Sequence, residues 1–295
     1  MSELDGELWR DIFYTSFDDL KLYARHYPAP YEKLRSVVCL PGLTRNARDF
    51  HYLASYLSRH PEKPRNVYCL DYRGRGRSQY DRNWRNYVPY IELIDTLDFL
   101  TIRGLHRVTV VGTSRGGLIA MLMATVRPTA MGAVVLNDIG PVIETRGLAR
   151  IVGYVGRMPV PKTWPEAVML LREMNERAFP DLDEAQWEEL AQALFDERKG
   201  RPALAYDRRL ARAFGTIDLS QTIPDLWPQF VALGQVPAFV IRGANSDVLS
   251  AETLKAMITR HPNLRALTVP DQGHAPLLKE PKTVEAIGAF LAAND

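Results

Sequence analysis

The sequence is poor in the features that mark secreted, membrane-spanning and nucleic-acid-binding proteins. It has 2 cysteines in 295 residues, too few for the disulfide framework of a small secreted domain. No stretch approaches the roughly 20 apolar residues of a transmembrane helix, and residues 1–7 lack the apolar core of a secretory signal. Lysine and arginine number 37 against 35 aspartates and glutamates, so no basic nucleic-acid surface is indicated. We expect a cytoplasmic protein without membrane or nucleic-acid partners.

Motifs for cofactors and metals are also missing. No His-Glu-x-x-His or Cys-x-x-Cys spacing occurs, so the sequence predicts no metal site. The pair Gly74-x-Gly76 lacks the third glycine of a dinucleotide fingerprint, and no cofactor is predicted. We interpret the basic run around it, residues 73–77, as a loop face exposed to solvent. Cys39 and Cys69 lie near the ends of predicted buried strands, and we expect both to be free thiols.

What the chain does contain is an alternation of predicted strands and helices. Apolar, β-branched runs such as 108–113 and 131–137 predict buried strands, and 87–102 has the periodicity of an amphipathic helix. A chain of 295 residues that is 46% apolar can bury a large core. The alternation predicts a mostly parallel sheet covered by helices on both faces.

The most informative stretch is Gly112-Thr113-Ser114-Arg115-Gly116, which lies between a predicted strand and an apolar helix. A serine on a sharp strand-to-helix turn projects its hydroxyl from the sheet. Glycines two residues before and after it remove the Cβ atoms that would collide in such a turn. The stretch therefore predicts Ser114 as a nucleophile.

An acid and a histidine follow in the order that a serine nucleophile requires. One predicted strand runs into a loop with Asp247, and a later one is followed by His274. A serine hydroxyl needs an imidazole to accept its proton and a carboxylate to orient that imidazole. We predict His274 as the base and Asp247 as the acid. Asp138, which also ends a strand, is the alternative acid, whereas Asp271 lies too near His274 along its loop.

These motifs resemble the α/β-hydrolase superfamily, and the resemblance spans nearly the whole chain. The similarity includes Pro41-Gly42, in place of the commoner His-Gly, and Asp71-Tyr72-Arg73-Gly74-Arg75-Gly76-Arg77-Ser78. It is greatest for capped serine esterases and lactonases. It implies an α/β-hydrolase fold with a mostly parallel, eight-stranded sheet flanked by helices, in which Cys39 and Cys69 lie on neighbouring strands. It also implies an oxyanion hole formed by the backbone N–H groups of Leu43 and Arg115.

The resemblance divides the chain into a core and an insertion. Residues 1–138 and 236–295 are expected to form the hydrolase core, and 139–235 a helical cap inserted after the sixth strand. Strand-like patterns are missing from this insertion, which instead predicts helices at 142–157, 164–179, 183–199, 203–214 and 223–233. We expect its tryptophans and methionines to pack these helices together and in part to line an apolar pocket.

The implied activity is hydrolysis of carboxylic esters or lactones through an acyl-enzyme intermediate, with a small molecule as substrate. Halide-releasing and epoxide-opening relatives carry aspartate at the position of Ser114, which argues against both reactions. A carbon–carbon bond hydrolase is an alternative, although such relatives usually have tryptophan where this chain has Ala275. Perhydrolysis with peroxide and a non-catalytic small-molecule receptor also stay open. The Arg115 side chain either binds a substrate anion or pairs with a nearby acid.

Overall fold

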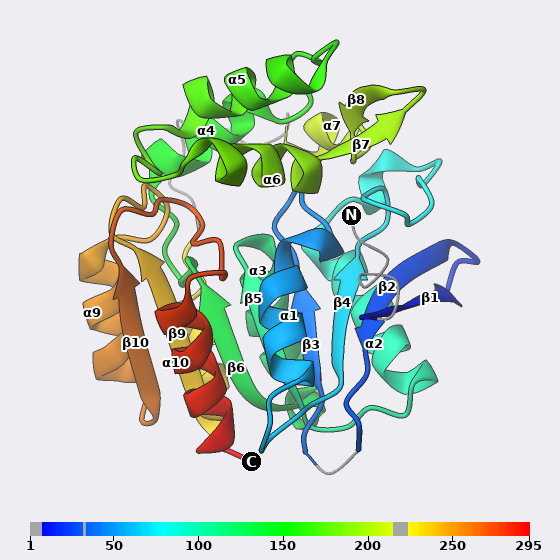
Figure 1. The fold of residues 1–295 in the computed structure, drawn as a ribbon. Helices are drawn as coiled ribbons and strands as arrows, with labels where there is room; N and C mark the ends of the chain where they lie inside the picture. The colour runs from blue at the N-terminus through cyan, green and yellow to red at the C-terminus, as the bar shows by residue number, and fades with distance from the viewer. Residues whose placement is uncertain (1–7, 32–33, 215–223) are drawn as a thin grey trace.

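The computed structural model describes residues 8–31, 34–214 and 224–295. Within these ranges eight strands form one sheet in the order β1-β2-β4-β3-β5-β6-β9-β10 (Figure 1). β2 is antiparallel to β1 and β4, and the other neighbouring pairs are parallel. The strands are Arg10–Thr15 (β1), Lys21–Tyr27 (β2), Val37–Leu40 (β3), Val67–Asp71 (β4), Val108–Thr113 (β5), Met131–Asn137 (β6), Ala238–Gly243 (β9) and Leu264–Val269 (β10). The predicted mostly parallel, eight-stranded sheet is confirmed.

Helices cover both faces of this sheet, as the alternating pattern predicted. Along β3, Val37 and Cys39 pack into one apolar core and Val38 and Leu40 into the other, because successive strand residues point to opposite faces. The first core holds α1 (His51–Ser58) and α10 (Pro281–Ala292). The second holds α2 (Pro89–Ile102), α3 (Arg115–Val126) and α9 (Ala251–Arg260). Short 3-10 turns join some elements, at Ala47–Phe50, Trp84–Asn86, Pro128–Ala130 and Leu233–Gln235.

Residues 139–214, which follow β6, lie over the edge at which the parallel strands end (Figure 1). We call residues 139–214 the insert. Its elements are α4 (Thr145–Tyr154), α5 (Trp164–Asn175), α6 (Glu184–Leu194), β7 (Phe195–Arg198), β8 (Arg201–Leu204) and α7 (Leu210–Phe214). Its buried side chains, Trp187 among them, belong to the same apolar core as α2 and α3. The insert is therefore packed onto the sheet layer through a shared core.

Two predictions for this segment are wrong in detail. The helix expected over 183–199 ends at Leu194, and an antiparallel hairpin of β7 and β8 follows it. The helix expected over 203–214 begins only at Leu210, because the strand β8 extends to Leu204. Lys199 and Gly200 have φ of 53° and 72°, the two positive values of a type I′ turn, which matches the twist of a hairpin. The adjacent Lys199 and Gly200 were the feature of the sequence that could have predicted this turn.

The last helix of the expected cap packs elsewhere. α8 (Trp227–Ala232) lies against α3, with the buried Phe230 in the core shared with α2. The predicted start of this helix, Ile223, lies outside the described residues. α8 therefore belongs to the helical layer that contains α3.

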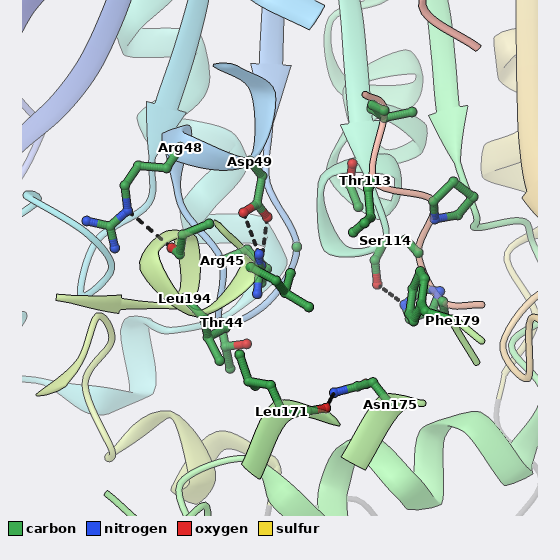
Figure 2. A pocket seen from close by; sticks show the side chains of 18 of the residues that line it. Thr44, Arg45, Arg48, Asp49, Thr113, Ser114, Leu171, Asn175, Phe179 and Leu194 are labelled. Atoms are coloured by element: carbon green, nitrogen blue, oxygen red, sulfur yellow. Dashed lines mark hydrogen bonds and ion pairs between the residues drawn. The ribbon is translucent and has the colours of Figure 1, made fainter. Parts of the chain in front are cut away.

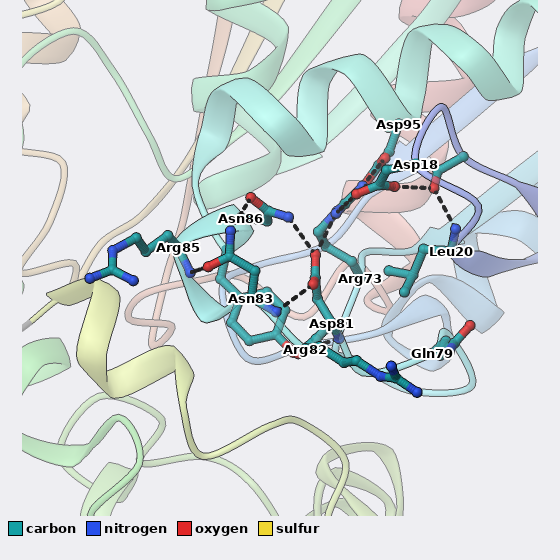
Figure 3. A network of polar contacts seen from close by, with 12 residues as sticks. Asp18, Leu20, Arg73, Gln79, Asp81, Arg82, Asn83, Arg85, Asn86 and Asp95 are labelled. Carbon is teal, nitrogen blue, oxygen red and sulfur yellow. Dashed lines mark hydrogen bonds and ion pairs between the residues drawn. The ribbon is translucent and has the colours of Figure 1, made fainter.

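The expectation that residues 73–77 form a solvated face is wrong for Arg73 and Arg75, which are both fully buried. Arg73 donates hydrogen bonds to the carboxylates of Asp18, Asp81 and Asp95 over 2.6–3.0 Å (Figure 3). These acids come from the β1–β2 turn, the loop after β4 and helix α2. One guanidinium thus joins three segments at this end of the sheet, because its fork of donors can serve several carboxylates.

The two cysteines lie side by side in the core. Cys39 on β3 is in register with Cys69 on β4, and both are buried free thiols. Burial raises the pKa of the Cys39 thiol well above its ordinary value, so this thiol is kept protonated and unreactive. No helix in the described ranges is long and apolar enough to cross a bilayer. Residues 1–7, on which the expectation about a secretory signal rested, lie outside those ranges.

At the end of β4, the carboxylate of Asp71 accepts hydrogen bonds from the backbone N–H groups of Ala47 and Arg77 at 2.7 and 2.8 Å. It is 2% exposed, and burial raises its pKa to about 6. The unfolded chain has an aspartate pKa near 3.9, so the folded protein binds this proton more tightly. The resulting stabilisation is complete below about pH 4 and is lost as the pH rises through about 6.

We predict that Asp71→Asn removes this part of the pH dependence. Urea unfolding of both proteins between pH 4 and pH 7 measures it. The free energy of unfolding of the wild type should fall relative to that of the variant as the pH rises from about 4 to about 6, and then stay level. A difference that is constant across this range would mean that Asp71 titrates at its ordinary pKa.

Candidate active site

Ser114 lies at the sharp turn between β5 and α3. Its backbone has φ 50° and ψ −109°, a conformation that costs a residue other than glycine about 1–3 kcal/mol. A Cβ on Gly112 would lie 2.5 Å from the carbonyl carbon of Gly116, and one on Gly116 would overlap the carbonyl oxygen of Leu40. The two glycines therefore let strand and helix approach closely enough to form the turn. The Ser114 side chain lines a cavity beneath the insert.

The imidazole of His274 lies between this hydroxyl and a buried carboxylate. Its Nε2 is 2.8 Å from Ser114 Oγ, and its Nδ1 is 2.8 Å from Asp138 Oδ2. When Nδ1 carries the proton and donates it to Asp138, Nε2 is free to accept the serine proton. The three residues follow β5, β6 and β10, whose carboxyl ends meet at one edge of the sheet. The arrangement has the geometry of a nucleophile, a base and an orienting acid.

The carboxylate in contact with His274 belongs to Asp138, and the prediction of Asp247 for this position is wrong. Asp138 is 0% exposed. Its Oδ1 accepts the N–H of Gly243 at 2.8 Å, and its Oδ2 accepts the hydroxyl of Ser246 at 2.6 Å. Gly243 is the last residue of β9 and Ser246 lies in the loop that follows it, the loop to which sequence reasoning assigned the acid. These two hydrogen bonds hold the Asp138 side chain in the orientation in which its Oδ2 faces His274 Nδ1.

Asp247 instead faces the insert. Its two carboxylate oxygens accept hydrogen bonds from Nε and Nη2 of Arg150 on α4, at 2.6 and 2.8 Å. Burial acts to raise the pKa of Asp247, but the hydrogen bonds and charge of Arg150 hold it below its ordinary value. A carboxylate held by a guanidinium in this bidentate way is satisfied without an imidazole. The pair joins the insert to the loop after β9.

The loop after β3 passes beside Ser114. A Cβ built on Gly42 would lie 4.0 Å from Ser114 Cβ, and the N–H of Arg45 closes a turn onto the carbonyl of Gly42 at 3.1 Å. Within the described ranges, the backbone N–H groups of Leu43 and Arg115 form no hydrogen bond to another residue. These are the two donors predicted for an oxyanion hole. The N–H of Arg115 has no intrahelical partner because it lies in the first turn of α3.

The side chain of Arg115 is directed away from the cavity. Its Nε donates to Glu92 Oε2 at 2.7 Å, and its Nη2 donates to the backbone carbonyl of Tyr87 at 3.1 Å. The guanidinium is 8% exposed and does not line the cavity. Of the two roles considered from the sequence, pairing with an acid is the one observed, with the acid on helix α2.

The cavity in front of Ser114 has a volume of about 200 Å³. Figure 2 shows Ser114 and Phe179 on one side, the Arg45–Asp49 ion pair on the other, and Leu171 and Asn175 of α5 projecting from the insert. Apolar side chains from the insert form much of its wall: Ile151, Met158, Leu171, Met174, Phe179, Leu190 and Leu194. The sheet therefore supplies Ser114 and His274 to the cavity, and the insert supplies apolar and polar side chains that form its wall.

Polar groups complete the lining of this cavity. Arg45 donates to both carboxylate oxygens of Asp49 at 2.6 and 2.7 Å, and Arg150 and Tyr154 come from α4. Sequence reasoning missed Arg150, Tyr154 and the supporting Ser246, because no local motif marks them. The roles of Arg150 and Tyr154 depend on where the insert packs, and that of Ser246 on how the loop after β9 meets Asp138. Within the described ranges, no group of three or more histidine, cysteine, aspartate or glutamate side chains is arranged to hold a metal ion.

The chain is similar to known proteins over most of its length. The sequence profile of the alpha/beta hydrolase family matches residues 37–287. The chain belongs to this family. It is 33% identical over 269 residues to the 3-hydroxybutyrate-oligomer hydrolase of Cupriavidus necator, across 87% of this chain and 88% of that protein.

Solved structures of other proteins superpose over nearly the full chain. An alpha/beta hydrolase from Novosphingobium aromaticivorans is 40% identical, with a TM-score of 0.89 over 97% of this chain and 98% of that one. The structure of E-2-(acetamidomethylene)succinate hydrolase is 20% identical, with a TM-score of 0.78 over 96% and 99% of the two chains. The similarity to E-2-(acetamidomethylene)succinate hydrolase shows a shared fold. The similarity to the Novosphingobium aromaticivorans protein extends to the sequence.

The geometry predicts that Asp138→Asn and Asp247→Asn differ sharply at His274. In the wild type, the proton on Nδ1 is held in a short, charge-assisted hydrogen bond, which gives a strongly downfield NMR resonance. Asp138→Asn should remove that resonance, and Asp247→Asn should leave it in place. If Asp247→Asn alone removed it, Asp247 would be the partner of His274.

Proposed function

We propose that this protein is a serine hydrolase that cleaves carboxylic esters or lactones through an acyl-enzyme intermediate. The observation that carries the proposal is the series of hydrogen bonds from Ser114 through His274 to Asp138, each 2.8 Å long. Membership of the alpha/beta hydrolase family supports hydrolysis as the class of reaction. Serine at the strained turn supports an acyl intermediate, because a hydroxyl activated by a neighbouring base attacks carbonyl carbon.

In the first half of the proposed reaction, Ser114 Oγ attacks the carbonyl carbon while His274 Nε2 takes the hydroxyl proton. The carbonyl oxygen becomes an oxyanion, which accepts hydrogen bonds from the N–H groups of Leu43 and Arg115. Asp138 keeps the imidazole in the tautomer that accepts this proton and stabilises the imidazolium. Collapse of the tetrahedral intermediate breaks the bond to the alcohol oxygen, and His274 gives its proton to the departing alcohol.

In the second half, a water molecule replaces the alcohol. His274 takes a proton from this water as its oxygen attacks the acyl carbon of the Ser114 ester. The second tetrahedral intermediate breaks the bond to Ser114 Oγ, which regains a proton from His274. The products are a carboxylic acid and the free enzyme, so atoms and protons balance without any cofactor.

For the substrate, we propose oligoesters of short hydroxy acids, with 3-hydroxybutyrate oligomers in particular. The similarity to the 3-hydroxybutyrate-oligomer hydrolase over 88% of that protein supports this choice. The cavity supports it too, because apolar Leu171, Phe179 and Leu194 stand beside polar Tyr154 and Asn175. A chain of such units alternates methyl branches with ester carbonyls, and this mixture suits a wall of both kinds.

We also propose that the insert acts as a cap over the reacting ester. Its helices α4, α5 and α6 supply most of the cavity wall opposite Ser114. Exclusion of bulk water by such a wall strengthens the electrostatic interactions within the site. We place the protein in the cytoplasm on the support of its buried free thiols, Cys39 and Cys69, because such pairs persist where the medium is reducing.

Replacement of the proposed nucleophile tests the reaction. Ser114→Ala should lower kcat on p-nitrophenyl butyrate by about a thousandfold or more, with an unchanged circular dichroism spectrum, and His274→Ala should act similarly. Ser58→Ala, which changes a buried serine of α1, is the matched control and should keep wild-type turnover. Activity of Ser114→Ala within a fewfold of wild type would remove Ser114 from the mechanism.

The substrate class needs a separate measurement. Purified protein incubated with linear 3-hydroxybutyrate trimer should release dimer and monomer, which chromatography measures. The kcat/KM for the trimer should be higher than for a p-nitrophenyl ester of similar acyl length. The physical reason is that units beyond the scissile ester contact the cavity wall and contribute binding energy in the transition state. Turnover of p-nitrophenyl esters without cleavage of the trimer would contradict the oligoester proposal and keep the esterase one.

A further inference from the structure

A cluster of three buried charges lies behind the two predicted oxyanion donors. Arg75 and Glu92 are 0% exposed and Arg115 is 7% exposed. Glu92 on α2 is the centre of the cluster: its Oε1 lies 2.8 Å from Arg75 Nη2 as an ion pair, and its Oε2 accepts Arg115 Nε at 2.7 Å. None of the three lines the cavity, so none of them can contact the substrate.

Each arginine of the cluster reaches one side of the oxyanion site. Arg75 Nε donates to the carbonyl of Leu43 at 2.9 Å, and its Nη1 donates to the carbonyl of Arg73 at 2.7 Å. This contact fixes the backbone of Leu43, whose N–H is one of the predicted donors. Arg115 carries the other donor on its own backbone, and its side chain is held by Glu92. The carboxylate of Glu92 thus connects the Leu43 side and the Arg115 side of the predicted oxyanion hole.

Buried charge of this kind is expensive. Removing an ion from water costs several kcal/mol even after relaxation of the protein. Apolar side chains of similar size commonly stabilise a core as much as a buried ion pair does. Burial acts to raise the pKa of Glu92, yet the charges of Arg115 and Arg75 hold it below its ordinary value. The cluster therefore contains two cations and one anion, with a net charge of +1 behind the place where negative charge would develop.

We propose that Glu92 is a positioning residue, which holds the Leu43 and Arg115 N–H donors in place through the side chains of Arg75 and Arg115. This inference rests on the proposed function, because a positioned donor pair matters only when an oxyanion forms. The effect falls on the transition state and leaves ground-state ester binding unchanged.

The test compares Glu92→Gln with Asp95→Asn. Asp95 lies on the same helix, is 2% exposed and binds Arg73, so it matches Glu92 as a buried carboxylate. When Asp95 becomes neutral, its partner Arg73 still pairs with the carboxylates of Asp18 and Asp81. Glu92→Gln should lower kcat on p-nitrophenyl butyrate by about tenfold to a hundredfold with little change in KM, somewhat less than the loss of a whole oxyanion donor. Asp95→Asn should change kcat by less than about threefold.

A second variant guards against failure of Glu92→Gln to fold, since that change leaves two buried cations without an anion. Arg75→Met keeps Glu92 and Arg115 as a neutral pair and removes only the donor to the Leu43 carbonyl. It should also lower kcat with little change in KM. The affinity of each variant for a trifluoromethyl ketone, which adds to the serine as a tetrahedral oxyanion, should fall by about the same factor as kcat/KM.

A third readout separates this proposal from the proposed function. In 15N-TROSY spectra of the free protein, the amide resonances of Leu43 and Arg115 should move further in Glu92→Gln and Arg75→Met than in Asp95→Asn. Absence of ester turnover by the wild type would count against the proposed function alone. Equal amide shifts in all variants, or kcat and ketone affinity that follow Asp95→Asn in folded protein, would overturn the positioning role of Glu92.

Discussion

The close approach of β5 and α3 at Gly112 and Gly116 is the constraint on which the rest of the site depends. It forces Ser114 into a left-handed backbone conformation, which the packed sheet maintains against a local cost of about 1–3 kcal/mol. That conformation places the hydroxyl within 2.8 Å of His274 and leaves the Arg115 N–H at the start of α3 without an intrahelical partner. The strained backbone of Ser114, the position of its hydroxyl and the free N–H of Arg115 thus all result from one turn.

The identity of the acid follows from the supply of hydrogen-bond donors. Asp138 has a positive φ of 56°, which turns its carboxylate back beneath His274 and toward the loop after β9. There it meets the N–H of Gly243 and the hydroxyl of Ser246. These two hydrogen bonds fix the direction of the carboxylate, and a carboxylate fixed in this way orients the imidazole. Asp247 meets a guanidinium instead, and that contact ties it to the insert.

The sequence predicted what depends on local pattern and failed where packing decides. The strand, turn and helix around Ser114 form one contiguous motif, and His274 follows a clear strand, so both positions were predictable. Asp138 and Asp247 each follow a strand at the same edge of the sheet, and only tertiary contacts determine which of them reaches the imidazole. The buried state of Arg75 was equally hidden, because an arginine between glycines in a loop normally lies in water.

The segment around Arg75 contacts both the insert and the loop beside Ser114. The backbone beside it pairs with the insert, since Gly76 N–H donates to the carbonyl of Ala205 at 2.7 Å and Asp207 N–H donates to that of Gly74 at 2.8 Å. Its side chain binds the carbonyl of Leu43 on the loop beside Ser114. Buried backbone hydrogen bonds are costly to leave unmade, so this junction resists separation. The wall of the cavity and the loop that faces the substrate carbonyl are consequently held by the same few residues.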